Sequence, residues 1–172
     1  MLTKIDICSM ALLKLGEKPI QSLVDESASA QLARTLFVPV VDSLIALHPW
    51  HFACQKIKLT KTSSQDFIIP SNILRVIKCP GHICGNRIVA DGKALDILAL
   101  VRVPTENFPG YFSSLVATRL AMEFCVPLTG DQTVFRMLTA LYESELRSAK
   151  FIDSTLEPNA CIDSFSLINA RF

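Results

Sequence analysis

Apolar residues recur at helical spacing near the N-terminal end of the chain. The pattern predicts one helix that begins after Thr3 and stops at Gly16, and a second over residues 28–47. Thr3 can cap the first helix, because the acidic residue Asp6 stands three positions later. Pro39 lies inside the second pattern and removes one backbone donor. We therefore expect the second segment to be a single bent helix.

Two further helices are expected later in the chain, at residues 111–126 and 132–151. A break at residues 127–131 separates them, and Asp131 is a suitable cap for the second of the two. Their predicted inward faces consist of Phe112, Leu115, Val116, Leu120 and Phe124 in the first, and Val134, Leu138, Leu141 and Tyr142 in the second.

The middle of the chain, about residues 54–103, has the pattern of short strands. Polar and apolar residues alternate over 53–62, strand-like segments follow at 73–79 and 87–90, and a last one covers 94–103. Asp91-Gly92 is a favourable hairpin turn between the last two. The sequence thus predicts three to five antiparallel strands and an α+β fold, mainly α. It would be a helical bundle with an inserted β-hairpin region and an extended C-terminal tail.

The helical periodicity fades after residue 153, although large apolar side chains continue. We divide the chain into one domain over residues 1–157, with the β insertion inside it, and a tail over 158–172. A solvated tail is normally poorer in large apolar residues, so we interpret this one as a docking arm. The alternative is that it folds back on its own bundle. The residues expected to anchor the arm are Phe165, Ile168, Arg171 and Phe172.

Composition narrows the classes of protein. The net charge of the 172 residues is +1, which argues against a generally basic nucleic-acid binder. Only 19% of residues are charged and the mean hydropathy is +0.37, so we expect apolar surface to be used in subunit contacts. No uninterrupted apolar run approaches the roughly 18 residues of a membrane span, so no membrane contact is expected. Asp6 interrupts any signal-peptide core, and the six cysteines are interpreted mainly as small buried apolar residues.

Charge is unevenly distributed along the chain. Residues 51–93 carry seven Lys or Arg against two Asp, whereas residues 94–172 carry six against nine acidic residues. Lys56, Lys58 and Lys61 therefore form a candidate basic face, directed at a DNA channel or at an acidic partner. The alternative is a solvated strand surface with no partner.

Few residues suggest catalysis. The chain has no glycine-rich phosphate loop and no Gly-x-Ser-x-Gly motif, and we expect no cofactor. Cys79, His82 and Cys84 could supply zinc ligands with Cys54 as a fourth, but their spacing matches no established zinc pattern. A turn at Pro80-Gly81 would explain the composition of this segment without a metal. Trp50, the only tryptophan, is expected to pack in the core.

Several segments, taken in order, resemble one family. They are the opening helix and turn ALLKLGEKPI at 11–20, the helix end LIALHPWHFA at 44–53, the strand start IPSNILRV at 69–76, and the paired helices FSSLVATRLAME at 112–123 and PLTG at 127–130. In this order they resemble the head-to-tail adaptor, or connector, proteins of tailed phages, a group that includes tail tubular protein A of short-tailed phages. Pro39 and the cysteine-rich turn at 79–84 depart from the family pattern.

The resemblance implies a structural virion protein without enzymatic activity. Such adaptors form rings, usually of twelve copies, that join the portal protein to the tail nozzle or tail tube. Double-stranded DNA passes through the lumen without sequence-specific binding. The expected location is the neck of the virion, and the host cytoplasm during assembly.

Two other functions stay open on the sequence. One is a small tail-associated hydrolase that degrades cell walls, using Cys79, His82 or His51. The other is a free-standing dimer that binds a host protein. Assembly on a portal ring would favour the adaptor, and turnover lost on His82→Ala would favour the hydrolase.

Overall fold

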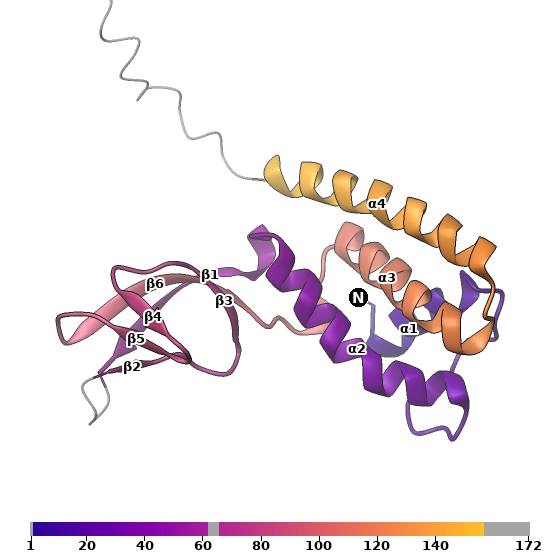
Figure 1. The fold of residues 1–172 in the computed structure, drawn as a ribbon, viewed down its shortest axis with the longest axis horizontal. Helices are drawn as coiled ribbons and strands as arrows, with labels where there is room; N and C mark the ends of the chain where they lie inside the picture. The colour runs from indigo at the N-terminus through magenta and orange to yellow at the C-terminus, as the bar shows by residue number, and fades with distance from the viewer. Residues whose placement is uncertain (1, 62–65, 157–172) are drawn as a thin grey trace, which may run out of the picture.

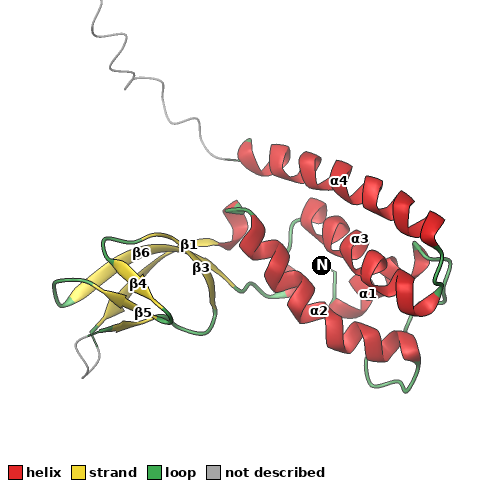
Figure 2. Cartoon of the chain, in the orientation of Figure 1, coloured by secondary structure: helices red, strands yellow, loops and turns green. Residues whose placement is uncertain are grey.

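The computed structural model describes residues 2–61 and 66–156. Figure 1 shows a helical bundle at one end of the long axis and a β unit at the other. The bundle is formed by α1 (Lys4–Leu13), α2 (Ala28–Leu47), α3 (Gly110–Leu128) and α4 (Gln132–Ser154), with short 3₁₀ turns η1 (His51–Ala53) and η2 (Thr105–Asn107). Figure 2 shows the two kinds of structure separated in space, which confirms a mainly helical α+β fold.

The β unit consists of two antiparallel sheets of three strands each. Its strands are β1 (Cys54–Thr60), β2 (Phe67–Ile68), β3 (Ile73–Lys78), β4 (His82–Cys84), β5 (Arg87–Val89) and β6 (Ala94–Val101). The first sheet has the order β1-β6-β3 and the second the order β2-β5-β4. Buried residues from both sheets, including Leu59, Phe67, Ile88 and Ile97, form one cluster, so the β unit has a core of its own.

The predicted hairpin across Asp91-Gly92 is wrong. Strand β5 pairs with β4 and β2, whereas β6 pairs with β1 and β3. The true hairpin is β4–β5, which turns at Gly85 with a φ of +60°. Asp91-Gly92 instead carries the chain from one sheet to the other, with Gly92 at a φ of +101°. Six strands are present in the described residues, more than expected, because β2 and β4 are too short to show an alternating pattern.

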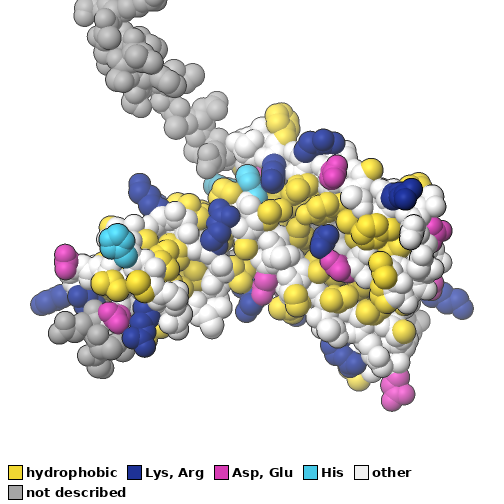
Figure 3. Space-filling view, viewed as in Figure 1, with side chains coloured by type: hydrophobic (Ala, Val, Ile, Leu, Met, Phe, Trp, Pro, Cys, Tyr) yellow, Lys and Arg dark blue, Asp and Glu magenta, His cyan; other side chains and the backbone are white. Residues whose placement is uncertain are grey.

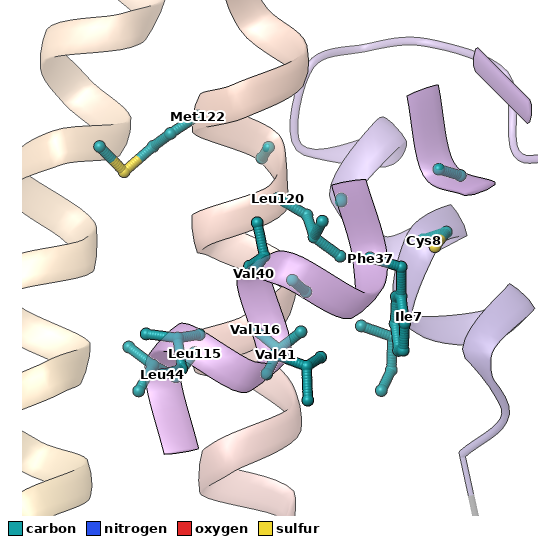
Figure 4. Packing of buried hydrophobic residues seen from close by; sticks show 14 of the residues in the cluster. Ile7, Cys8, Phe37, Val40, Val41, Leu44, Leu115, Val116, Leu120 and Met122 are labelled. Atoms are coloured by element: carbon teal, nitrogen blue, oxygen red, sulfur yellow. The ribbon is translucent and has the colours of Figure 1, made fainter. Parts of the chain in front are cut away.

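Helix α3 is the central helix of the bundle and packs against α1, α2 and α4. All five of its predicted inward residues are buried, which confirms that face. Figure 4 shows Val40 and Leu44 of α2 beside Leu120 and Leu115 of α3. Helix α2 has the expected bounds and continues through Pro39.

The predicted caps are also present. The Thr3 hydroxyl accepts a hydrogen bond from the Asp6 N–H at 3.2 Å, and the Asp6 carboxylate accepts one from the Thr3 N–H at 2.8 Å. At the start of α4, the Asp131 carboxylate accepts from the Thr133 and Val134 N–H groups at 2.7 and 3.2 Å. Both helices therefore begin where the local sequence predicted.

Helix α4 is the most exposed of the four helices. Leu138 is buried and Val134 and Tyr142 are half-buried, but Leu141, predicted to face inward, is 41% exposed. The prediction for Leu141 fails because α4 lies on the outside of the bundle and packs mainly on α3, so only a narrow stripe is covered.

Helix α2 is long and apolar enough to cross a membrane by length and composition, with a mean hydropathy of 1.4 in its most apolar window. Its buried residues form one face of the bundle, which accounts for the same composition without a membrane. The absence of membrane contact stays a prediction. The tail residues Phe165, Ile168, Arg171 and Phe172 lie outside the described residues.

Candidate interaction surfaces

Two of the three predicted basic residues share an exposed face. Lys56 and Lys58 of β1 lie on the outer side of the first sheet, opposite Leu98 and Asp96 of β6. Lys61 does not belong to this face: it is half-buried, and its ammonium lies 5.6 Å from the centroid of the Phe67 ring. Side chains alternate along a strand, so positions 56 and 58 agree with each other and position 61 does not.

A third lysine, which sequence reasoning missed, completes the face. Lys78 at the end of β3 pairs with Leu98 from the side opposite Lys56. The register of β3 shifts between Val76 and Lys78, and such irregularities redirect side chains. Lys56, Leu98 and Lys78 therefore form a row across three strands. The local pattern contains no signal for this shift.

These residues line a shallow groove of about 670 Å³, which we call the basic groove. Its lining is Lys56, Ile57, Lys58, Lys78, Cys79, Pro80, Asp96, Ile97 and Leu98. Half-buried Leu98 lies between two lysines, and Asp96 is the only carboxylate in the lining. Within residues 2–61 and 66–156, none of Lys56, Lys58 and Lys78 forms an ion pair. The groove thus presents three ammonium groups around an apolar floor.

A buried carboxylate connects the end of α4 to the segment between α2 and β1. Asp153 is 3% exposed and accepts a hydrogen bond from the Tyr111 hydroxyl at 2.8 Å. Both of its oxygens lie 3.1 Å from the backbone N–H of His51, which donates to them. The His48 Nε2 lies 3.6 Å from the carboxylate. We call this group the Asp153 joint, and its members come from the α2–β1 connection, α3 and α4.

The surroundings of the joint shift two pKa values. Burial lowers the pKa of His48, against the opposing effect of the Asp153 carboxylate, and Lys150 and Arg75 lower it further. Burial, together with the hydrogen bond to Asp153, raises the pKa of Tyr111 far above its ordinary value. Tyr111 therefore stays protonated as a donor. The Asp153 carboxylate is buried and already accepts hydrogen bonds from Tyr111 and His51. It therefore fixes the positions of three elements and is not accessible to a ligand from solution.

Trp50 packs beside the joint, as expected of a core residue. Its side chain is fully buried, and the indole N–H donates to the Leu44 carbonyl at 2.7 Å. Its ring contacts Phe112 edge-on, with centroids 5.2 Å apart. This satisfies the one polar atom of the side chain and confirms the prediction.

The cysteine and histidine residues considered for zinc or hydrolysis form no shared site among the described residues. The Cys79 thiol donates to the Gly81 carbonyl at 3.3 Å, His82 and Cys84 are exposed on β4, and Cys54 packs against the bundle core. No group of three or more His, Cys, Asp or Glu is placed to hold a metal in the part of the chain that the structure describes. His51 belongs to the Asp153 joint, at the bundle end of β1. The geometry therefore lends no support to either site.

A close backbone approach explains the glycine in that turn. A Cβ on Gly81 would lie 2.6 Å from the Val89 carbonyl oxygen, closer than any side chain tolerates. The Pro80-Gly81 turn thus packs directly on β5.

A second polar group holds the middle of α4, and sequence reasoning missed it as well. Glu145 accepts hydrogen bonds from Thr118 at 2.5 Å and from Ser114 at 3.2 Å, both on α3. Lys14, just after α1, lies 3.2 Å from the same carboxylate. These residues are distant in sequence, so no spacing rule brings them together.

Apolar side chains remain exposed along one side of α4. Met137 is 68% exposed, and Leu141, Phe151 and Ile152 are exposed as well. Figure 3 shows many apolar side chains on the visible face of the bundle, with Lys and Arg side chains distributed over both the bundle and the β unit. Such a surface is typical of a protein that contacts others.

Comparisons with known proteins find no family model and no curated protein that matches this chain.

Proposed function

We propose that the chain is a structural head-to-tail adaptor of a tailed-phage virion, without enzymatic activity. It would form a ring that joins the portal protein to the tail nozzle or tail tube and surrounds the DNA exit channel. The proposal begins from the sequence resemblance. The observation that supports it further is a set of hydrogen bonds and ion pairs that hold the bundle and the β unit in one arrangement.

Two polar contacts cross the junction between the bundle and the β unit. Arg102, just after β6, binds Asp42 of α2 through two hydrogen bonds of 2.9 and 2.5 Å. Arg75 of β3 donates to the Ala46 carbonyl near the end of α2 at 2.7 Å. The Asp153 joint fixes η1, the turn that leads into β1, against α3 and α4. A protein that transmits position between two partners needs such a fixed relation between its ends, and paired arginine–carboxylate bonds impose it.

The exposed apolar surface of α4 supports the ring. Met137, Leu141 and Ile152 are exposed although the chain has enough residues to bury a large core. Burial of such side chains between subunits is the usual way in which an oligomer uses them.

The charge of the β unit suits contact with DNA that has to move. Lys56, Lys58 and Lys78 are exposed, and the net charge of the whole chain is only +1. Affinity for DNA rises steeply with the number of phosphates neutralised, so a weakly basic protein would not retain the duplex. The same lysines would also suit an acidic neighbour.

The adaptor hypothesis is tested by binding to a purified portal ring. The full chain should co-sediment with the ring, and a chain that lacks residues 158–172 should fold, by circular dichroism, but stay in the supernatant. Phe165→Ala and Phe172→Ala should weaken binding, whereas Ser166→Ala should not. Failure of the full chain to bind any portal ring would contradict the proposal.

The hydrolase hypothesis has no observation in its favour. Its residues Cys79 and His82 form no dyad among the hydrogen bonds of the described residues. Cell-wall turnover by the full chain that is lost on His82→Ala would nevertheless replace the adaptor proposal with this one.

A further inference from the structure

The shape and charge of the basic groove indicate the kind of group that it accommodates. Leu98 forms a half-buried apolar floor with Lys56 on one side and Lys78 on the other, and Lys58 is close by on β1. A single exposed apolar side chain with carboxylates next to it in sequence would satisfy both features. The rounded surface of a duplex would reach the lysines but leave the floor uncovered, so the groove favours a short acidic protein segment.

The loop between α1 and α2 has this composition. Val24 is 82% exposed, the most exposed of the large apolar side chains in the described residues, and exposed Asp25 and Glu26 follow it directly. The loop is held in shape by its own hydrogen bonds. The Val24 N–H donates to the Ser22 hydroxyl at 3.1 Å, and the Ser22 N–H donates to the Asp25 carboxylate at 3.3 Å.

The groove and the loop belong to opposite ends of the molecule. Figure 1 shows the β unit at one end of the long axis and the loop that precedes α2 at the other. One copy cannot bring its own loop to its own groove, so their complementarity can be used only between copies.

We propose that the Val24-Asp25-Glu26 loop of one copy docks in the basic groove of the next. Val24 would cover Leu98, and the two carboxylates would meet Lys56, Lys58 and Lys78. This inference rests on the proposed ring. The contact joins two different surfaces, so it is heterologous, and repetition of a heterologous contact closes into a ring when the rotation allows.

Exposed ion pairs are screened by salt, so self-association through this contact should depend on the salt concentration. The Debye length falls from about 10 Å at 0.1 M salt to about 3 Å at 1 M. Self-association through this contact should therefore weaken steeply over that range. Association through the apolar side of α4 alone would not weaken in this way.

Charge reversal on the full chain tests the contact, with sedimentation velocity as the readout over increasing protein concentration at low salt. The groove variant is Lys56→Glu/Lys78→Glu and the loop variant is Asp25→Lys/Glu26→Lys. A control, Lys93→Glu/Arg136→Glu, has the same charge change as the groove variant at exposed positions outside the groove. Circular dichroism checks that each variant folds.

The wild type and the control should self-associate, and the groove and loop variants should each do so at least about tenfold more weakly. A mixture of the groove and loop variants should associate again, because every reversed groove then meets a reversed loop. This rescue excludes misfolding as the cause of the losses.

Several results would overturn the docking proposal. They are a wild type that stays monomeric at the highest concentration, a reversed variant that associates like the wild type, or a mixture that fails to associate. Binding of a labelled DNA duplex that is lost in the groove variant, without any change in self-association, would assign the groove to DNA instead. Portal binding is measured separately, so a groove variant that self-associates like the wild type and still binds the portal overturns this contact and leaves the adaptor function standing.

Discussion

Replacement of the buried Asp153 should destabilise the protein more than replacement of any exposed residue of α4. The carboxylate accepts a charge-assisted hydrogen bond from the Tyr111 hydroxyl and another from the His51 N–H, and it is almost fully buried. A hydrogen bond to a charged group contributes about 1.5–3 kcal/mol, and a donor left buried without an acceptor adds to the loss.

The magnitude depends on what replaces the carboxylate. Asp153→Ala removes both acceptors and should lower the free energy of unfolding by about 3–5 kcal/mol. Asp153→Asn has a side chain of the same shape and keeps one acceptor oxygen, so it should lower the free energy of unfolding by about half as much. Glu143→Gln, at an exposed position on the same helix, is the matched control and should change stability by less than about 0.5 kcal/mol.

Urea unfolding followed by tryptophan fluorescence is the appropriate assay. Trp50 is the only tryptophan and packs beside the joint, so its emission reports on this region directly. An Asp153→Ala variant within about 0.5 kcal/mol of the wild type, at an unchanged denaturant slope, would refute the assignment of Asp153 as a structural joint.

Three further predictions follow from the same structure. Burial holds the pKa of His48 in the folded protein below its ordinary value of 6.5, so the unfolded chain binds this proton first as the pH falls. The free energy of unfolding should be at its full value above about pH 6.5 and fall as the pH drops through the folded pKa, and His48→Gln should flatten that part of the urea-midpoint profile. An unchanged pH slope in His48→Gln would count against this origin. Leu120→Ala should cost about 2–5 kcal/mol in urea unfolding because the side chain is fully buried, and a loss below about half a kcal/mol would contradict the core assignment. Thr3→Ala should cost about 1 kcal/mol by removing the cap of α1, whereas Thr3→Ser should be nearly neutral in the same measurement.

Local sequence signals were sufficient for the helices. The stripe and the capping residues place α2 at its observed bounds and identify Thr3 and Asp131 as caps. These features depend on neighbours within one or two turns. The exposure of Leu141 was missed because the width of a buried stripe depends on how many elements cover the helix, which its own sequence does not encode.

Local sequence signals could not predict the strand pairing or the residues that form the Asp153 joint. Alternation fixes which face a strand buries but not which strand it pairs with, so the local sequence predicts a hairpin turn at Asp91-Gly92 although this segment links two sheets. Asp153 and His51 are 102 positions apart, and only the packing of α4 on α3 brings them together. The sequence does indicate that Lys61 lies away from the groove. Side chains alternate along a strand, so an odd-numbered position faces the other side from Lys56 and Lys58.

The central claim is that this chain forms a ring between a portal and a tail, and electron microscopy of the full chain bound to a portal ring tests it most directly. The account predicts a second ring coaxial with the portal, with one copy of the chain for each portal subunit and an open lumen along the axis. Single copies bound off the axis, or portal rings with no added density, would contradict it.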